Sequence, residues 1–478
     1  MKIVLSKQPS LYGTSLRNIS LLAGMFFPYG SPAFAGEPSL YSTKRVSPSS
    51  KPNIILILTD QQTASAMSCA GNADVKTPAM DALAKDGCIF NRAYCSYPLS
   101  GPSRASLMTG KMPVELGVKD NDHPLSDADM SRNIGFVMQE GGYDCLYAGK
   151  WHIPEVEIPE GRGFTKVSGM DDRILAESCR PYLVGDRQKP LFLVASFLNP
   201  HEICEYARSE SLHYGLLPDV DPKICPNLPV NYMESTYWPE ALSLHKREMM
   251  KSYPTSGYTQ DDWRRYLYAY YRLVERVDAE LGKLIGVLKS EGLYDNSVII
   301  FSSDHGDGVA NHQWNQKRAL SEAVVNVPLI VKAPKNMQKQ SLFASSALVN
   351  IGLDLFPTIC DYAGVVLPGG LNGQSLRPLI EGRAEHVAGE VFVETLLDGV
   401  NVRGWSIIEQ DYKYVFYRFY KNREQLFSLQ NDPGEMLNLA VDQRQHEHLM
   451  RLRKKMYNWA LKTNDKMLQK ALVDLIAE

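Results

Sequence analysis

The sequence predicts an α/β protein: a large, mostly parallel β-sheet flanked by helices, followed by a smaller C-terminal α+β domain. Short, continuous apolar runs alternate with helix-like segments through residues 53–384, which is typical of a sheet covered on both faces. From about residue 385 the pattern changes to closely spaced strand candidates and then a charged helical stretch. The 478 residues exceed what one core usually holds, so we expect domains at 53–384 and 385–478.

Four apolar runs are predicted to be strands of the large sheet. Each is too short for a helix and has no alternation, as expected of a strand buried on both faces. They are Asn53–Thr59, Leu191–Phe197, Ser297–Ser303 and Val327–Val331. Polar residues follow three of these runs: Asp60, Asn199 to His201, and Asp304 with His305. Ligands bind beyond the carboxyl ends of parallel strands, so a site is expected there.

The segment Asp261–Ser290 is predicted to be a long amphipathic helix. Its apolar stripe consists of Leu267, Tyr270, Leu273, Val274, Val277, Leu281, Ile285 and Leu288. Residues 202–260 have weak periodicity and are predicted to form a long loop over the active face. In the small domain, helix is expected from about residue 441 onward, after strands at Val391–Glu394, Val402–Ile408, Tyr412–Arg418 and Gln425–Leu429.

Residues 1–35 are predicted to be an export signal. Basic residues precede the apolar stretch Ile19–Phe27, and Ala33–Ala35 offers small residues for cleavage. The alternative is a disordered or buried N-terminal segment. Residues 36–52, rich in Ser and Pro, are predicted to be a linker. No other run reaches the roughly 18 apolar residues of a membrane span, so we expect a periplasmic or extracellular protein without one.

The charges nearly balance, with 51 basic and 54 acidic residues and a formal charge of -3. No whole-chain field therefore favours nucleic acid, and any anion site must be local. Eight cysteines permit disulfides in an exported protein, and Cys204 with Cys225 is the best candidate pair. Buried free thiols are the alternative. No CxxC pair occurs, so a thiolate zinc site is not expected.

The most informative segment is Ser100-Gly-Pro-Ser-Arg-Ala-Ser-Leu-Met-Thr-Gly110. Structurally it is typical of a helix N-terminus, with Pro102 in the first turn. Such an end, with a hydroxyl and Arg104, is also an anion site, because unpaired N–H groups and a guanidinium converge there. The segment resembles the sulfatase signature at every fixed position: Cys or Ser, then x-Pro-Ser-Arg, three variable residues, Leu or Met, and Thr-Gly.

This resemblance implies an alkaline phosphatase-like sulfatase fold and the hydrolysis of sulfate monoesters. In the family the first signature residue, here Ser100, is oxidised to formylglycine, and one hydroxyl of the hydrated aldehyde attacks sulfur. A Ser at this position implies a serine-type sulfatase-maturing radical enzyme as a partner, acting before export. Relatives of this length that carry an export signal often act on sulfated sugars. The resemblance therefore implies a bacterial carbohydrate sulfatase whose substrate is a sulfated glycan, such as a glycosaminoglycan, mucin or algal glycan.

Two further blocks resemble the metal-binding strand ends of the family: Thr59-Asp60-Gln61 and Ser303-Asp304-His305-Gly306-Asp307. The resemblance implies Ca²⁺, with Mg²⁺ as the alternative, bound by Asp60, Gln61, Asp304, His305 and the formylglycine from Ser100. Many relatives carry a second Asp in place of Gln61 and Asn in place of His305. An amide oxygen can still ligate calcium, whereas a histidine makes the identity of the metal less certain.

The remaining catalytic residues also follow from the resemblance. Three segments resemble further family blocks: Gly149-Lys150-Trp151-His152, Asn199-Pro200-His201 and Gln316-Lys317-Arg318-Ala319. They imply that Arg104 and Lys150 bind the sulfate. His201, assisted by Lys317, is the implied acid for the leaving alkoxide, and His152 is the implied base that releases sulfate.

Weaker hypotheses concern substrate contacts. His123, together with Lys119, Asn121 and Asp122, follows the signature helix, and His312 follows the second metal block. Arg403 and Trp405 in the small domain are further candidates. The alternative for each is a surface or core role without substrate contact, which is the more common fate of a lone histidine or arginine.

Two other functions remain as alternatives. A phosphatase or phosphodiesterase of the same superfamily would use unmodified Ser100 and two metal ions. The sequence offers carboxylate and histidine ligands for one metal ion. A glycan-binding protein that has lost the reaction would show decayed motifs. Every catalytic position that can be matched is filled, which argues against such a loss.

Overall fold

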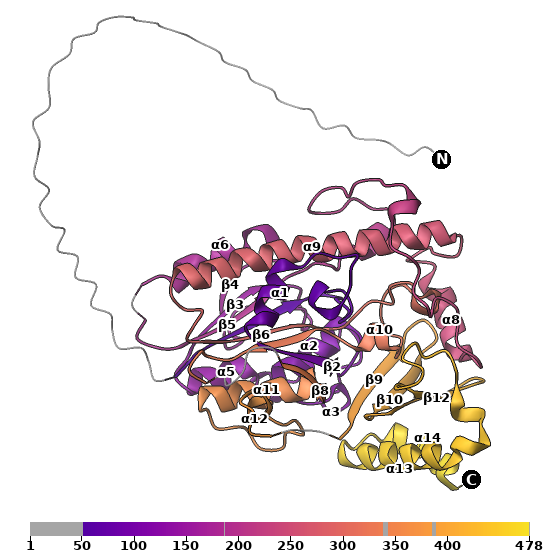
Figure 1. Ribbon diagram of the computed structural model, residues 1–478. Helices are drawn as coiled ribbons and strands as arrows, with labels where there is room; N and C mark the ends of the chain where they lie inside the picture. Colours follow the sequence, from indigo (N-terminus) through magenta and orange to yellow (C-terminus); the bar gives the residue numbers. More distant parts are fainter. Residues whose placement is uncertain (1–50, 186, 338–342, 385–388, 478) are drawn as a thin grey trace, which may run out of the picture. The chain divides into compact units, whose positions relative to one another are not determined.

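The computed structural model describes residues 51–185, 187–337, 343–384 and 389–477, which lie within one compact unit, Val46–Glu478 (Figure 1). The predicted export signal at 1–35 and the linker up to residue 50 lie outside the described residues. Within the described ranges, no helix combines the length and the apolar character that crossing a membrane requires.

A large sheet of eight strands forms the centre of the fold, in the order β4-β3-β5-β1-β6-β7-β2-β8. All neighbours are parallel except β7, which is antiparallel to β6 and β2, so the predicted mostly parallel sheet is confirmed. The strands are β1 (Asn53–Thr59), β2 (Cys88–Tyr94), β3 (Asp144–Gly149), β4 (Thr165–Ser168), β5 (Leu191–Ser196), β6 (Ser297–Ser303), β7 (Leu329–Lys332) and β8 (Phe343–Asn350).

Helices cover both faces of this sheet. On one face lie α1 (Pro78–Lys85), α6 (Asp172–Leu183) and α9 (Gln260–Ser290), and on the other lie α2 (Ser100–Thr109), α5 (Ile134–Glu140) and α11 (Ile351–Ala363) (Figure 1). Burial on both faces explains why β1, β5 and β6 are apolar throughout. The helix predicted at Asp261–Ser290 is confirmed as α9, and all eight residues of its predicted stripe are buried.

The prediction that residues 202–260 form one long loop is wrong in part. The segment contains two helices, α7 (Ile203–Ala207) and α8 (Glu240–Met249). Both are short, and α8 buries only Ala241, Leu242 and His245, which is too few positions to give a clear helical period in the sequence. The other short helices are α3 (Pro113–Leu116), α4 (Asp127–Met130), α10 (Glu322–Val325) and α12 (Arg377–Ile380).

A smaller antiparallel sheet, in the order β12-β11-β10-β9, follows near the C-terminus and confirms the predicted α+β part. Its strands are β9 (Val391–Leu397), β10 (Val402–Ile408), β11 (Tyr412–Tyr417) and β12 (Glu424–Ser428). One face packs on α13 (His446–Lys462) and α14 (Lys466–Ala477). The domain boundary at 384/385 stays a prediction, because residues 385–388 lie outside the described part.

All eight cysteines are free, so the predicted Cys204–Cys225 disulfide is wrong. The two side chains have separate surroundings. Cys204 Sγ lies 2.9 Å from Gln316 Oε1, whereas Cys225 Sγ lies 3.7 Å from the carbonyl oxygen of Asp221. The alternative of free thiols therefore holds, and a core of this size does not depend on disulfides.

Candidate active site

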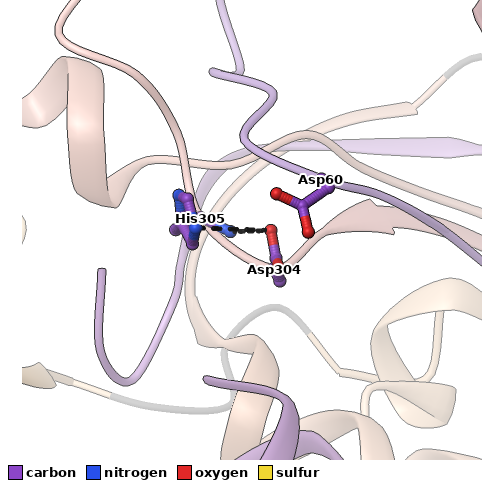
Figure 2. Close-up of side chains that lie close together, drawn as sticks. All are labelled: Asp60, Asp304 and His305. Carbon is purple, nitrogen blue, oxygen red and sulfur yellow. Dashed lines mark hydrogen bonds and ion pairs between the residues drawn. The ribbon is translucent and has the colours of Figure 1, made fainter. Parts of the chain in front are cut away.

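Four neighbouring strands place polar residues at one edge of the large sheet. Because β1 and β6 are parallel and pair Thr59 with Ser303, Asp60 and Asp304 leave the sheet side by side. His305 is the next residue after Asp304, and Figure 2 shows the side chains of Asp60, Asp304 and His305 close together. One ligand atom from each lies within 4.8 Å of the others, and all three residues are buried. Two carboxylates and an imidazole fit a divalent cation.

The tautomer of His305 follows from its contacts. Nδ1 lies 2.9 Å from the carbonyl oxygen of Gly306, which accepts only, so Nδ1 carries the proton. The other nitrogen, Nε2, is therefore left with a lone pair. It lies 3.1 Å from Ser100 Oγ. His305 can thus act as a metal ligand or as an acceptor for the serine hydroxyl.

Ser100 is the first residue of α2, and its side chain is 0% exposed. Its Oγ lies 3.4 Å from Asp60 Oδ2, so the positive end of the helix faces the carboxylate cluster. The backbone N–H of Gly101 donates to Asn121 Oδ1 at 2.9 Å. The segment that follows α3 therefore covers the end of the helix, next to Ser100.

Arg104 and Lys150 neutralise the carboxylates. Arg104 donates from Nε to Asp304 at 2.8 Å and from Nη2 to Asp60 at 3.1 Å. Its Nη1 donates to Ser196 Oγ at 2.7 Å and to the carbonyl oxygen of Lys150 at 2.9 Å. Lys150 Nζ lies 2.7 Å from Asp60 Oδ2. Burial alone would raise the pKa of Asp60, but Lys150 and other nearby cationic groups hold it well below its usual range.

His201 and Lys317 form a pair at the edge of the cluster, with Nε2 and Nζ 3.5 Å apart. Burial and the charge of Lys150 lower the pKa of His201 well below its usual range. Burial would also lower the pKa of Lys317, but neighbours including Cys204 and Asp60 raise it. At neutral pH the proton of this pair therefore lies on Lys317, and His201 is neutral.

His152 is held in a left-handed backbone conformation, with φ of 60°, two residues after Lys150. Burial, and then the charge of Lys150, lower its pKa to about 3. The imidazole is therefore neutral at pH 7 and able to accept a proton. Its Nδ1 is buried and has no hydrogen-bond partner within the described part of the chain. The side chains of His152, His201 and Lys317 are half-buried, so solvent reaches the cluster on their side.

Comparison with known proteins identifies the family of this chain. A sequence model of the family described as Sulfatase matches residues 52–365. The chain belongs to the sulfatase family. A second model, described as N-sulphoglucosamine sulphohydrolase, C-terminal, matches residues 310–462 of this sulfatase. The sequence prediction of a sulfuric ester hydrolase is confirmed.

Two similar sulfatases are from Bacteroides thetaiotaomicron. A Delta 4,5-hexuronate-2-O-sulfatase is 28% identical, over 82% of this chain and 85% of the relative. An N-acetylglucosamine-6-O-sulfatase is 26% identical, over 85% of each chain. A solved structure of a 2-O GAG sulfatase, 26% identical, superimposes with a TM-score of 0.77 over 87% of this chain and 93% of that one. The predicted fold class is confirmed by this likeness.

The weaker candidates lie in different places in this sulfatase. His123 is two residues after Asn121, which accepts a hydrogen bond from the first turn of α2, and its buried Nδ1 has no hydrogen-bond partner among the described residues. His312 is buried against Trp238, and its Nδ1 lies 3.1 Å from the carbonyl oxygen of Met233. In the part of the chain that the structure describes, no hydrogen bond joins the His312 side chain to Asp60, Asp304 or His305.

Arg403 also lies apart from the cluster. It donates to Glu394 at 2.6 Å and lies over the ring of Trp405. The indole N–H of Trp405 in turn donates to Asp465 at 3.0 Å. These contacts connect the small sheet to the residue that precedes α14, and they account for the positions of both side chains. The substrate contacts of His123, His312 and Arg403 stay predictions.

Sequence reasoning missed Asp172, which supports the segment that carries His201. Asp172 is buried at the start of α6 and accepts the backbone N–H groups of Leu198 at 2.6 Å and Asn199 at 2.9 Å. An acidic residue at a helix start is common, and the sequence gives no sign that its acceptors lie 26 and 27 residues away.

Replacing Asp172 with asparagine is expected to lower the free energy of unfolding by about 1–3 kcal/mol. An asparagine side chain has one acceptor oxygen, so one of the two buried N–H groups loses its partner. Urea denaturation followed by circular dichroism measures the change. Glu177→Gln, at an exposed position of the same helix, is the control and should stay within about 0.5 kcal/mol. Equal stability of the two variants would contradict the prediction.

Proposed function

We propose that this sulfatase hydrolyses sulfate monoesters of carbohydrates, with a formylglycine derived from Ser100 and a bound Ca²⁺. One observation carries the proposal: Ser100, at the positive end of a buried helix, faces the Asp60 and His305 side chains where Arg104 and Lys150 converge. The names of the relatives, a hexuronate sulfatase and an N-acetylglucosamine sulfatase, support a sugar substrate.

The cluster fits the implied metal. Asp60, Asp304 and His305 offer two carboxylates and the free Nε2 of an imidazole, all buried. Ser100 Oγ lies 3.1 Å from this nitrogen, and Gln61 is the next residue in the chain after Asp60. We propose these five residues as the ligands. When bound, the cation would neutralise sulfate oxygens and activate the hydroxyl of the formylglycine hydrate. Oxygen ligands favour Ca²⁺, and Mg²⁺ is the alternative.

The remaining roles follow from charge and proton location. Arg104 and Lys150 would neutralise the sulfate oxygens from the protein side. Lys317 is protonated, and its Nζ lies 3.5 Å from His201 Nε2. This pair would therefore protonate the leaving alkoxide, and the proton would come from Lys317. His152, neutral and with an unpartnered nitrogen, would accept the proton when sulfate is released.

A phosphatase or phosphodiesterase that uses unmodified Ser100 is less well supported. Such sites usually bind two metals. Among the described residues, one group of three metal-binding side chains is found, and Arg104 and Lys150 stand beside it. The proposal also includes export through the signal at 1–35, to the periplasm or the outside of the cell, after modification by a serine-type maturing enzyme.

The test is the mass of the tryptic peptide that contains Ser100, from protein expressed with and without a serine-type maturase. We expect a mass lower by H₂ only with the maturase, and sulfate release from sulfated sugars only in that sample. Full activity of protein with an unmodified Ser100 would overturn the formylglycine proposal. Release of phosphate but not sulfate by that protein would favour the phosphatase.

A further inference from the structure

Asp307 has none of the roles discussed so far, yet it is 0% exposed and has many hydrogen-bond partners. Gln61 Nε2 donates to its Oδ2 at 2.8 Å, and Tyr266 OH lies 3.1 Å from both oxygens. The backbone N–H groups of Val309 and Gln316 donate to it at 2.8 and 3.0 Å. A fully buried carboxylate with this many donors is fixed in position.

The side chain of Gln61 lies between Asp307 and Lys317. Its Nε2 faces the Asp307 carboxylate, and its Oε1 accepts from Lys317 Nζ at 3.1 Å. A carboxylate only accepts and an ammonium only donates, so one orientation of the amide satisfies both neighbours. The reversed amide would place oxygen against a carboxylate and NH₂ against an ammonium. The assignment of the two amide atoms therefore rests on chemistry.

The backbone of Gln61 is fixed as well, so the amide flip is the main freedom that this residue keeps. Its φ is 68°, in the left-handed region that a non-glycine residue rarely adopts. Its N–H donates to Asp304 Oδ1 at 3.1 Å, and its carbonyl oxygen accepts from Tyr270 OH at 2.7 Å. The first of these bonds ties the peptide to a carboxylate of the metal cluster.

We propose that Asp307 is a positioning residue, which holds the Gln61 amide with its oxygen toward Lys317, the orientation in which this oxygen can serve as one of the proposed metal ligands. The inference rests on the proposed function, because Gln61 acts as a ligand only if the cluster binds a cation. An amide can ligate Ca²⁺ through oxygen but not through NH₂, so a reversed amide removes one ligand. Partners that orient metal ligands in this way commonly change metal affinity when they are replaced.

The test is a double-mutant cycle read by calorimetric titration of the metal-free full-length protein with Ca²⁺. Asp307→Asn is expected to weaken calcium binding by roughly 10-fold, because it removes the charge that selects one amide orientation. Gln61→Met, which has no amide, is expected to weaken it by at least as much. Asp307→Asn added to Gln61→Met is expected to have less than about a twofold effect, because the two residues act as one unit.

The matched control is Asp278→Asn. Asp278 is also buried and accepts two backbone N–H groups, from Ala79 and Met80, but it belongs to α9 and α1. The Asp278→Asn substitution should lower the Tm and leave calcium affinity unchanged. If Asp307→Asn weakens calcium binding equally in the unmutated protein and in the Gln61→Met variant, the inference is wrong. The proposed function is not affected by that result. Failure of the unmutated protein to bind either Ca²⁺ or Mg²⁺ would overturn both.

Discussion

Replacing Ser100 with alanine is expected to abolish sulfate ester hydrolysis, with kcat/KM lower by on the order of 10⁴-fold or more. The Oγ position is where the proposed nucleophile forms, facing Asp60 and His305 at 3.4 and 3.1 Å. The fold should be retained, because one hydroxyl is lost from a helix whose other nine residues remain buried. Sulfate release and thermal denaturation, measured on the same preparations, separate the two effects.

Ser100→Cys is the matched control for this prediction. Cysteine is the other residue that the sulfatase signature allows at this position, so this variant should be active when it is expressed with a maturase that oxidises cysteine. It should be as inactive as Ser100→Ala when no maturase is present. Residual activity of the alanine variant within about tenfold of the unmutated enzyme would show that Ser100 is not the nucleophile.

Replacing Arg104 with leucine is expected to cause the largest loss of stability, about 3–5 kcal/mol in calcium-free buffer. The guanidinium is 1% exposed and pairs with Asp60 and Asp304, which are both 0% exposed. Its removal leaves buried carboxylates with one counterion fewer. Added calcium should restore part of the loss, because the proposed site would place the cation between the same carboxylates. Denaturant unfolding with and without Ca²⁺ measures both effects.

Two further variants sharpen the test of Arg104. Arg104→Lys keeps the charge but cannot reach Asp60, Asp304 and Ser196 together, so its stability should lie between those of Arg104→Leu and the unmutated protein. Arg180→Leu removes an exposed arginine, which pairs with Glu177, and should cost less than about 1 kcal/mol. A loss from Arg104→Leu no larger than that from Arg180→Leu would contradict the predicted role.

The sequence predicts four of the eight strands of the large sheet, β1, β5, β6 and β7, because these are buried along their whole length. Burial removes the polar positions that would interrupt β1, β5 and β6, so unbroken apolar runs mark them. The antiparallel direction of β7 depends instead on pairing across the sheet, which local sequence does not encode. The short helices α7 and α8 were missed for a related reason, because each buries too few side chains to give a period.

The central residues of the candidate site were predicted because they lie in short blocks that resemble those of one family. Asp60, Ser100, Arg104, Lys150 and Asp304 are indeed together. The supporting contacts were not predicted, since Gln61 and Asp307 are 246 positions apart in the chain. A carboxylate that orients another side chain has no sequence pattern of its own. The predicted Cys204–Cys225 disulfide is wrong for a similar reason, because two cysteines that flank one segment of the sequence need not be close in space.

The complete burial of Ser100 also has a consequence for when this residue can be modified: before folding is complete. An enzyme that oxidises Ser100 would need access to its side chain, yet in the folded protein every residue of α2 is buried. If Ser100 is modified as proposed, modification therefore competes in time with folding. A chain that folds first is trapped as a stable but inactive protein. The fraction of active enzyme in a cell would then depend on the rate of folding as well as on the amount of maturase.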